Sequence, residues 1–228
     1  MTRIAETTLF ILSCALALSA TPAAAVTIAN PSNTYSFPYL SGSLTGGNQT
    51  QYIGETFTAP ITGDLTDFQF TLNTSNLQSL YGIVYAWNGT NPTTELYRSA
   101  VIGGGAGLVD FKPVGVKLTQ GQSYVAFLST FGLANNSGLA TVGTCLAFNP
   151  NCNSNAIPNL GTLIYGNVLS DTVVFNPVVN NSQDATFSAT ITAPVPEPST
   201  WAMLILGMGA TGVALRRRKR GTPIAQLA

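Results

Sequence analysis

Phe68-Gln-Phe-Thr-Leu72 and Tyr81-Gly-Ile-Val-Tyr-Ala-Trp87 carry the clearest structural pattern in this chain. In the first segment, large apolar side chains alternate with polar ones. Successive side chains of a β-strand point to opposite faces, so this segment predicts a strand with one face in the core. In the second segment, apolar side chains occupy both positions of the alternation, which predicts a strand covered on both faces.

Two further segments extend this pattern. Phe187-Ser-Ala-Thr-Ile-Thr192 alternates again, and Tyr124-Val-Ala-Phe-Leu128 is almost continuously apolar after the turn residues Gln120-Gly-Gln122, which predicts a central strand. Residues 30–48 read as irregular, and turn-forming runs occupy residues 60–63, 88–92, 103–107, 135–138 and 149–158. The spacing predicts an all-β fold over residues 26–192: an antiparallel β-sandwich of about eight to ten strands with a jelly-roll topology.

The composition of the chain excludes several classes of function for residues 26–192. Between residues 26 and 192 there are three cationic side chains and seven anionic ones, a net charge of −4, because most cations gather at the carboxyl end. The segment lacks the basic surface of nucleic-acid-binding proteins, so we expect no nucleic-acid partner. The chain contains no histidine, which excludes Ser-His-Asp and Cys-His catalysis. We expect a protein that is not an enzyme and has no cofactor.

Residues 1–25 have the pattern of a secretory signal peptide, including an apolar run that is too short to span a bilayer. The small residues Ala23 and Ala25 fit a signal-peptidase site, and we predict cleavage before Val26. Cys14 leaves a lipoprotein signal as the alternative. The apolar run ahead of Cys14 is short for such a signal, and it continues after the cysteine.

The carboxyl end combines three unlike elements: Val195-Pro-Glu-Pro-Ser-Thr200, an uncharged apolar run over residues 201–215, and a block of cations. Prolines on both sides of Glu197 forbid a helix there, so residues 193–200 predict a Pro-rich linker. The apolar run predicts a single transmembrane helix, and the cations stay on the cytoplasmic side. This stop and tail, residues 216–228, begins with Arg216, Arg217, Arg218, Lys219 and Arg220.

This end of the chain resembles the PEP-CTERM sorting signal, in the form where Trp-Ala-Met closely follows Pro-Glu-Pro. The resemblance implies a bacterial exported protein that exosortase, a membrane-embedded processing enzyme, recognises and processes. It implies transient insertion in the inner membrane, then a place at the cell surface or in the extracellular matrix, with exosortase and the secretion machinery as partners. An association with exopolysaccharide or biofilm is also implied. The matching residues are Pro196, Glu197, Pro198, Trp201, Ala202, Met203, Gly207, Gly209, Gly212 and the cations 216–220.

The length of the apolar run supports a temporary anchor. At ~1.5 Å per residue, residues 201–215 span about 22 Å, less than the ~30 Å hydrocarbon core of a bilayer. Within this run, Gly207-Met-Gly-Ala-Thr-Gly212 spells the dinucleotide-binding G-x-G-x-x-G pattern. Its place inside an apolar run directly before the cations instead indicates close packing of membrane helices.

Cys145 and Cys152 are the cysteines that remain after export, into a compartment that permits disulfides. We predict a bridge between them, worth about 2–3 kcal/mol in the loop-entropy description. Two free thiols or a metal pair are the alternatives, but two cysteines without histidine make a poor zinc site. We expect no metal; a structural calcium at Asp64 and Asp67 is the alternative.

Aromatic and acidic residues leave two other functions open. Trp87, Tyr85 and Tyr97, with Tyr81 nearby in sequence, could form a glycan face, as in a carbohydrate-binding module or adhesin; ordinary packing of these rings is the competing interpretation. A glycosidase would need two carboxylates flanking a cleft, whereas carboxylates beside turns are usually solvated. The acidic candidates are Glu55, Glu95, Asp64, Asp67 and Asp110.

Overall fold

The structure is a computed structural model of the full chain. It describes residues 24–43, 49–146, 157–168, 175–180 and 183–194, together with positions 207, 209, 211 and 212. The chain divides into two units: Ala23–Pro194, and a second unit made of Met1–Pro22 and Val195–Ala228. The first of them, Ala23–Pro194, contains all the strands and is called the β unit.

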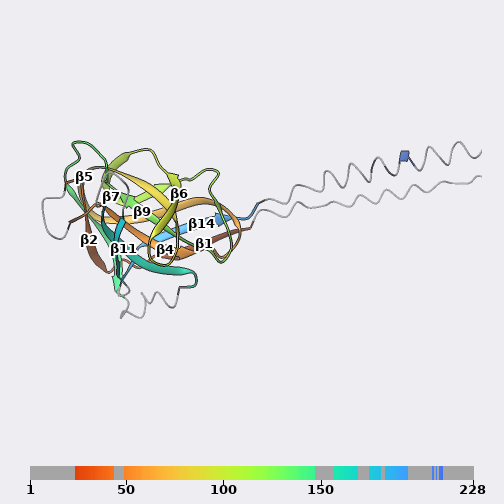
Figure 1. Cartoon of the computed structure of the whole chain (residues 1–228), viewed down its shortest axis with the longest axis horizontal. Coiled ribbons are helices and arrows are strands. Elements are labelled where there is room, and N and C mark those ends of the chain that lie inside the picture. Colours follow the sequence, from red (N-terminus) through yellow and green to blue (C-terminus); the bar gives the residue numbers. More distant parts are fainter. Residues whose placement is uncertain are drawn as a thin grey trace, which may run out of the picture. The chain divides into compact units, whose positions relative to one another are not determined.

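Fourteen strands of the β unit join in one sheet (Figure 1). All described strand pairs are antiparallel except the short parallel pair of β2 and β3. The strands are β1 (Ala25–Asn30), β2 (Tyr35–Ser41), β3 (Gln49–Thr50), β4 (Tyr52–Thr58), β5 (Gly63–Trp87), β6 (Pro92–Arg98), β7 (Ile102–Phe111), β8 (Lys117–Leu118), β9 (Ser123–Ser129), β10 (Leu139–Leu146), β11 (Leu160–Val168), β12 (Phe175–Asn180), β13 (Gln183–Ala185) and β14 (Phe187–Thr192).

The 25-residue strand β5 connects two ladders of strands. Its first part, up to Leu80, pairs with β14, β7, β8 and β10, in the first ladder. Its last part, from Tyr81, pairs with β9 and β6 in the second ladder, which runs β12-β11-β4-β9-β5. The all-β, antiparallel prediction is confirmed. The predicted sandwich of two separate sheets with jelly-roll topology is not confirmed, because β5 joins both ladders into one continuous sheet.

Both ladders contribute to one hydrophobic core. Phe68, Phe70 and Leu72 of β5 are at most 1% exposed, as the alternation of the sequence predicts. The ring of Phe57, from β4 in the second ladder, lies 5.8 Å from the ring of Phe187, from β14 in the first. The core cluster therefore fills the space between the ladders.

A second cluster covers the other face of the second ladder. Ile83 and Tyr85 of β5 belong to it, together with Val125 and Phe127 of β9, whereas Val84 belongs to the core cluster. The prediction that residues 81–87 are covered on both faces is confirmed. The central position of β9 is confirmed as well, since β9 pairs with β4 on one side and β5 on the other.

Two local predictions were wrong. Residues 103–107, predicted as a turn, lie within β7 alongside β5. Their glycines permit this close approach, since a Cβ at Gly104 would lie 2.7 Å from the carbonyl oxygen of Leu77. Residues 30–48, predicted as irregular, contain strand β2. The turn at residues 88–92 is confirmed: the Asn88 side chain accepts hydrogen bonds from the backbone N–H groups of Thr90 and Asn91.

Candidate functional site

The first and last strands of the β unit are direct neighbours (Figure 1). Ala25 pairs with Thr192 and Val26 with Ile191, and the N–H of Ala193 donates to the carbonyl oxygen of Ala24 at 2.8 Å. The start of β1 and the end of β14 are therefore adjacent in the sheet.

The predicted signal-peptidase site lies at the start of this pair. Ala23 is outside the described residues, Ala25 is exposed at the first position of β1, and Val26 is half-buried. Cleavage between Ala25 and Val26 would remove one pair from the β1–β14 ladder and keep the pairs from Val26 to Asn30. The cleavage site itself stays a prediction.

The sorting-motif residues and the cationic stop lie outside the described residues: Pro196, Glu197, Pro198, Trp201, Ala202, Arg216, Arg217, Arg218, Lys219 and Arg220. Of the predicted transmembrane helix, only positions 207, 209, 211 and 212 are described. There, the hydroxyl of Thr211 donates to the carbonyl oxygen of Gly207 at 2.8 Å. In the described part of the chain, no helix has the length and apolar character needed to cross a bilayer.

Cys145 is fully buried on β10, where its Sγ accepts a hydrogen bond from the hydroxyl of Thr34 at 3.8 Å. Cys152 lies outside the described residues. The bridge between Cys145 and Cys152 therefore stays a prediction.

The three aromatic residues of the predicted glycan face do not come together. Tyr85 and Trp87 lie on the face of the second cluster, as members of it or packed against it. Tyr97 packs against the core cluster instead, with its ring 6.0 Å from that of Phe68. Tyr97 pairs directly with Val84, and residues directly opposite each other in an antiparallel pair share a face.

The acidic residues considered for calcium binding have lysine partners. Asp64 is 3.1 Å from Lys117, and Asp67 and Asp110 both contact Lys112, at 3.2 and 2.8 Å. Burial and the neighbouring Asp110 raise the pKa of Asp67. Burial opposes ionisation of Asp110 too, but hydrogen bonds from Lys112, Asp67 and Gln69, together with the charge of Lys112, outweigh it and lower the pKa of this carboxyl. Among the described residues, no three His, Cys, Asp or Glu side chains are grouped as metal ligands.

Glu55 is the exception to solvated carboxylates, because its side chain is fully buried between the core residues Ile53 and Phe57 of β4. Its Oε2 accepts a hydrogen bond from the N–H of Ala185 at 2.8 Å, and Oε1 has no hydrogen-bond partner. Burial, followed by the charge of the nearby Asp184, raises the pKa of Glu55 well above its ordinary value. Of the acidic candidates, Asp67 and Asp110 lie together, because both contact Lys112. Glu95 pairs with Arg98 and is not brought next to another acidic candidate.

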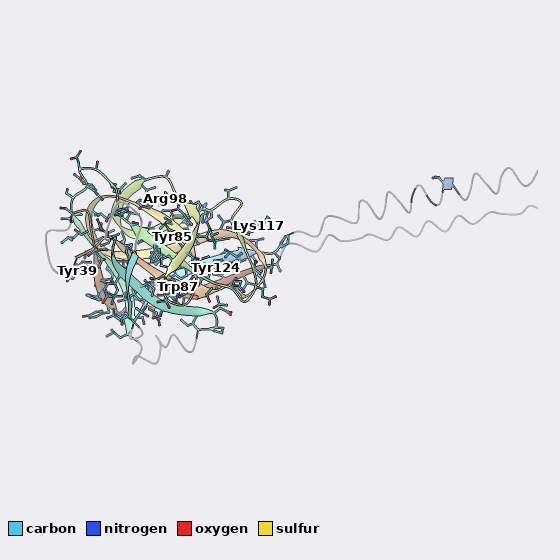
Figure 2. All side chains as sticks on the ribbon, viewed as in Figure 1. Tyr39, Tyr85, Trp87, Arg98, Lys117 and Tyr124 are labelled. Carbon is cyan, nitrogen blue, oxygen red and sulfur yellow. The ribbon has the colours of Figure 1, made fainter. Side chains whose placement is uncertain are left out.

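A pocket of about 310 Å³ opens on the second-cluster face. Tyr85 and Arg98, which Figure 2 labels, belong to its lining. Its lining comes from four parts of the chain: β4, the end of β5, residues 98–101, and residues 129–133 at and after the end of β9. The lining includes Tyr52, Tyr81, Ile83, Tyr85, Arg98 and Phe131.

Hydrogen bonds hold the polar groups of this pocket in place. The hydroxyl of Tyr81 donates to the carbonyl oxygen of Phe131 and accepts from Ser129, both at 3.1 Å. The hydroxyl of Tyr85 donates to Glu95 at 2.9 Å, and Arg98 forms a two-pronged bond to the same carboxylate. Burial and the bond to Glu95 raise the pKa of Tyr85, whereas the bond from Arg98 lowers the pKa of Glu95.

Sequence reasoning named Tyr81 and Tyr85 but missed the other members of this pocket. The apolar residues on both faces of 81–87 indicated that something covers the second face. They did not reveal which segments cover it, because Ser129 and Phe131 are about fifty residues away in the chain and reach Tyr81 only through β-strand pairing.

Residues 194–219 match the family model described as the PEP-CTERM protein-sorting motif, which confirms that the chain carries this motif and indicates sorting through exosortase. No curated protein matches the chain. A solved structure of infectious bursal disease virus, Gt strain, aligns with 96% of this chain at 15% identity and a TM-score of 0.27, too low to carry an argument. The chain covers 53% of that virus chain.

Proposed function

We propose that this chain is an exported, non-enzymatic protein of the cell surface or extracellular matrix. Residues 201–215 hold it briefly in the inner membrane, and exosortase processes it near Pro196-Glu197-Pro198. One structural observation carries the proposal: the sheet is complete before the sorting motif begins. β14 ends at Thr192, and after cleavage before Val26 its pairs with β1 still run from Val26 opposite Ile191 to Asn30 opposite Phe187.

A cut near the motif would therefore leave the β unit whole. Strand β14 is anchored by β1 on one side and β5 on the other, and its apolar face, Phe187, Ala189 and Ile191, is at most 2% exposed. Removing residues beyond Pro194 breaks none of these contacts. The sorting segment can therefore be cut off without loss of these contacts, which supports release of the β unit outside the cell. The lack of histidine in the whole chain supports a role other than catalysis.

The test is mass spectrometry of the protein recovered from membranes and from the medium. We expect the exported form to lack peptides from Glu197 to Arg220 and to begin at Val26. A Glu197→Ala chain should accumulate unprocessed in the membrane. Asp64→Ala, which removes a half-exposed carboxylate of the β unit, is the matched control and should be processed normally. Recovery of the intact peptides 197–220 from the extracellular protein would contradict processing.

Association with exopolysaccharide is a second candidate function, as a carbohydrate-binding module or adhesin. The observation that supports it is that Trp87, at the end of β5, is half-buried on one face of the second ladder and lies outside the lining of the pocket described above. Glycan arrays probed with the wild-type chain and with Trp87→Ala test it. Binding equal to background in both chains would remove this candidate without affecting the sorting proposal.

A further inference from the structure

The pocket on the second-cluster face has a buried floor and an open rim. Tyr52, Tyr81, Ile83 and Tyr85 are at most 5% exposed, whereas Val101 at the rim is 54% exposed. A volume of about 310 Å³ lies at the small end of ligand pockets, which span about 300–1,000 Å³. The dimensions therefore suit a small ligand that enters past Val101.

The hydroxyl groups of Tyr81 and Tyr85 in the floor do not favour a ligand rich in hydroxyl groups. The hydroxyl of Tyr81 is already bonded to Ser129 and Phe131, and that of Tyr85 to Glu95. A sugar that accepted hydrogen bonds from these hydroxyl groups would have to break existing ones, and each buried group left unpaired costs about 1–3 kcal/mol. The floor favours a ligand with an apolar body.

Arg98 supplies the charge. Arg98 is the charged residue among the described lining residues. Its guanidinium carbon lies 4.8 Å from the centre of the Tyr81 ring. Glu95 holds it through Nε at 3.0 Å and Nη2 at 2.6 Å. These bonds use two of the five N–H donors of a guanidinium. A planar guanidinium fixed at the edge of an apolar pocket matches a carboxylate best.

We propose that this pocket binds a small apolar carboxylate, with a body the size of a single ring. The body packs against Tyr52, Ile83 and Phe131, and the carboxylate accepts hydrogen bonds from Arg98. Because Glu95 and the ring of Tyr81 already position the guanidinium, binding requires little ordering of this long side chain. This inference goes beyond the sorting function and does not depend on where the chain is processed.

Fluorine NMR tests the proposal with the full chain in lipid nanodiscs and empty nanodiscs as the blank. The probe is 4-(trifluoromethyl)benzoate, and its matched neutral analogue is 4-(trifluoromethyl)benzyl alcohol. We expect the benzoate to bind about tenfold more tightly than the alcohol, the size of one charge-assisted hydrogen bond. A methyl glucoside should not displace the benzoate.

Variants connect binding to this pocket. Arg98→Gln should remove the preference for the benzoate, and Val101→Trp, at an exposed rim position, should block both probes. Lys112→Gln removes a cation that lies outside the lining and should change nothing. The proposal is overturned if neither probe binds the wild-type chain, if the glucoside displaces the benzoate, or if Arg98→Gln binds both probes as the wild type does. The neutral analogue keeps the test decisive should Arg98→Gln fold poorly.

Discussion

Glu55 and Ala185 are joined inside the core: the carboxylate oxygen Oε2 lies 2.8 Å from the backbone nitrogen of Ala185. The first residue is on β4 in the second ladder, and the second is on β13, which pairs with β10 in the first. This hydrogen bond links the two ladders inside the fold, where Asp184 is buried as well. Because Oε1 has no partner, the protonated carboxyl is the form that the core tolerates.

Stability should consequently fall as the pH rises. The pKa of Glu55 is raised in the fold above its ordinary value of 4.5, so the folded state binds the proton more tightly than the unfolded state. The contribution of this group is fully present below pH 4.5 and is lost as the pH rises toward its folded pKa, by up to about 1.4 kcal/mol per pH unit. Urea unfolding at a series of pH values measures the slope.

Glu55→Gln should flatten that slope, because the amide does not ionise. Glu95→Gln is the control with the opposite sign: the pKa of Glu95 is lowered, chiefly by the bond from Arg98, so its contribution is lost as the pH falls. If wild type and Glu55→Gln show the same dependence on pH above 4.5, the buried carboxyl is not protonated in the fold.

Adjacent glycines of β7 should differ sharply in their tolerance of alanine. A Cβ at Gly104 would lie 2.7 Å from the carbonyl oxygen of Leu77, whereas a Cβ at Gly103 has open space around it. We expect Gly104→Ala to cost about 1–3 kcal/mol of unfolding free energy, as overpacking usually does, and Gly103→Ala to stay within about 0.5 kcal/mol. Equal effects in thermal unfolding would contradict the close approach of β5 and β7.

Phe68 should be among the most sensitive core positions. Its ring is fully buried and stacks on Phe111 with the ring centres 4.8 Å apart. Phe68→Ala should cost about 3–5 kcal/mol. Leu108→Ala, on β7 at 65% exposure, provides the control and should change the midpoint of unfolding little. Similar losses for the two variants would mean that the β5–β7 face is not the core face.

Truncation should separate the sheet from its sorting segment. A chain that ends at Pro194 keeps β14 with all its pairs to β1 and β5, so its β unit should unfold at the same temperature as in the full chain. A chain that ends at Thr186 loses β14 and the buried side chains of Phe187, Ala189 and Ile191, and should not fold. Circular dichroism and calorimetry distinguish the outcomes. Clear destabilisation of the chain ending at Pro194 would mean that the sorting segment supports the fold.

The strands and turns that depend on neighbouring residues alone could be predicted from the sequence. The alternation in residues 187–192 and the turn at Gln120-Gly-Gln122 appear in the structure as expected, with Gly121 at φ +77°. The elements that depend on distant partners were not predictable. The continuity of β5 through residues 73–80 depends on β7 and β10.

The two largest surprises have the same origin. Glu55 looked like a solvated side chain because its partner, Ala185, is 130 residues away. Tyr97 looked like a neighbour of Tyr85, but the register of β6 on β5 shifts between Val84 and Tyr85 and places the two rings on opposite faces. Spacing along the chain cannot reveal such a shift.

The pairing of β1 with β14 also imposes an order on export. Among the described strands, β1 pairs with β14 alone, and the residues they join, such as Thr27 and Thr190, lie 163 positions apart. A chain that emerges amino end first must therefore keep β1 without a strand partner until nearly the whole β unit has crossed the membrane. We infer that the sheet can be completed only after nearly the whole β unit has been translocated. Export intermediates arrested before residue 187 should leave β1 open to protease, and protection of β1 in such intermediates would refute the inference.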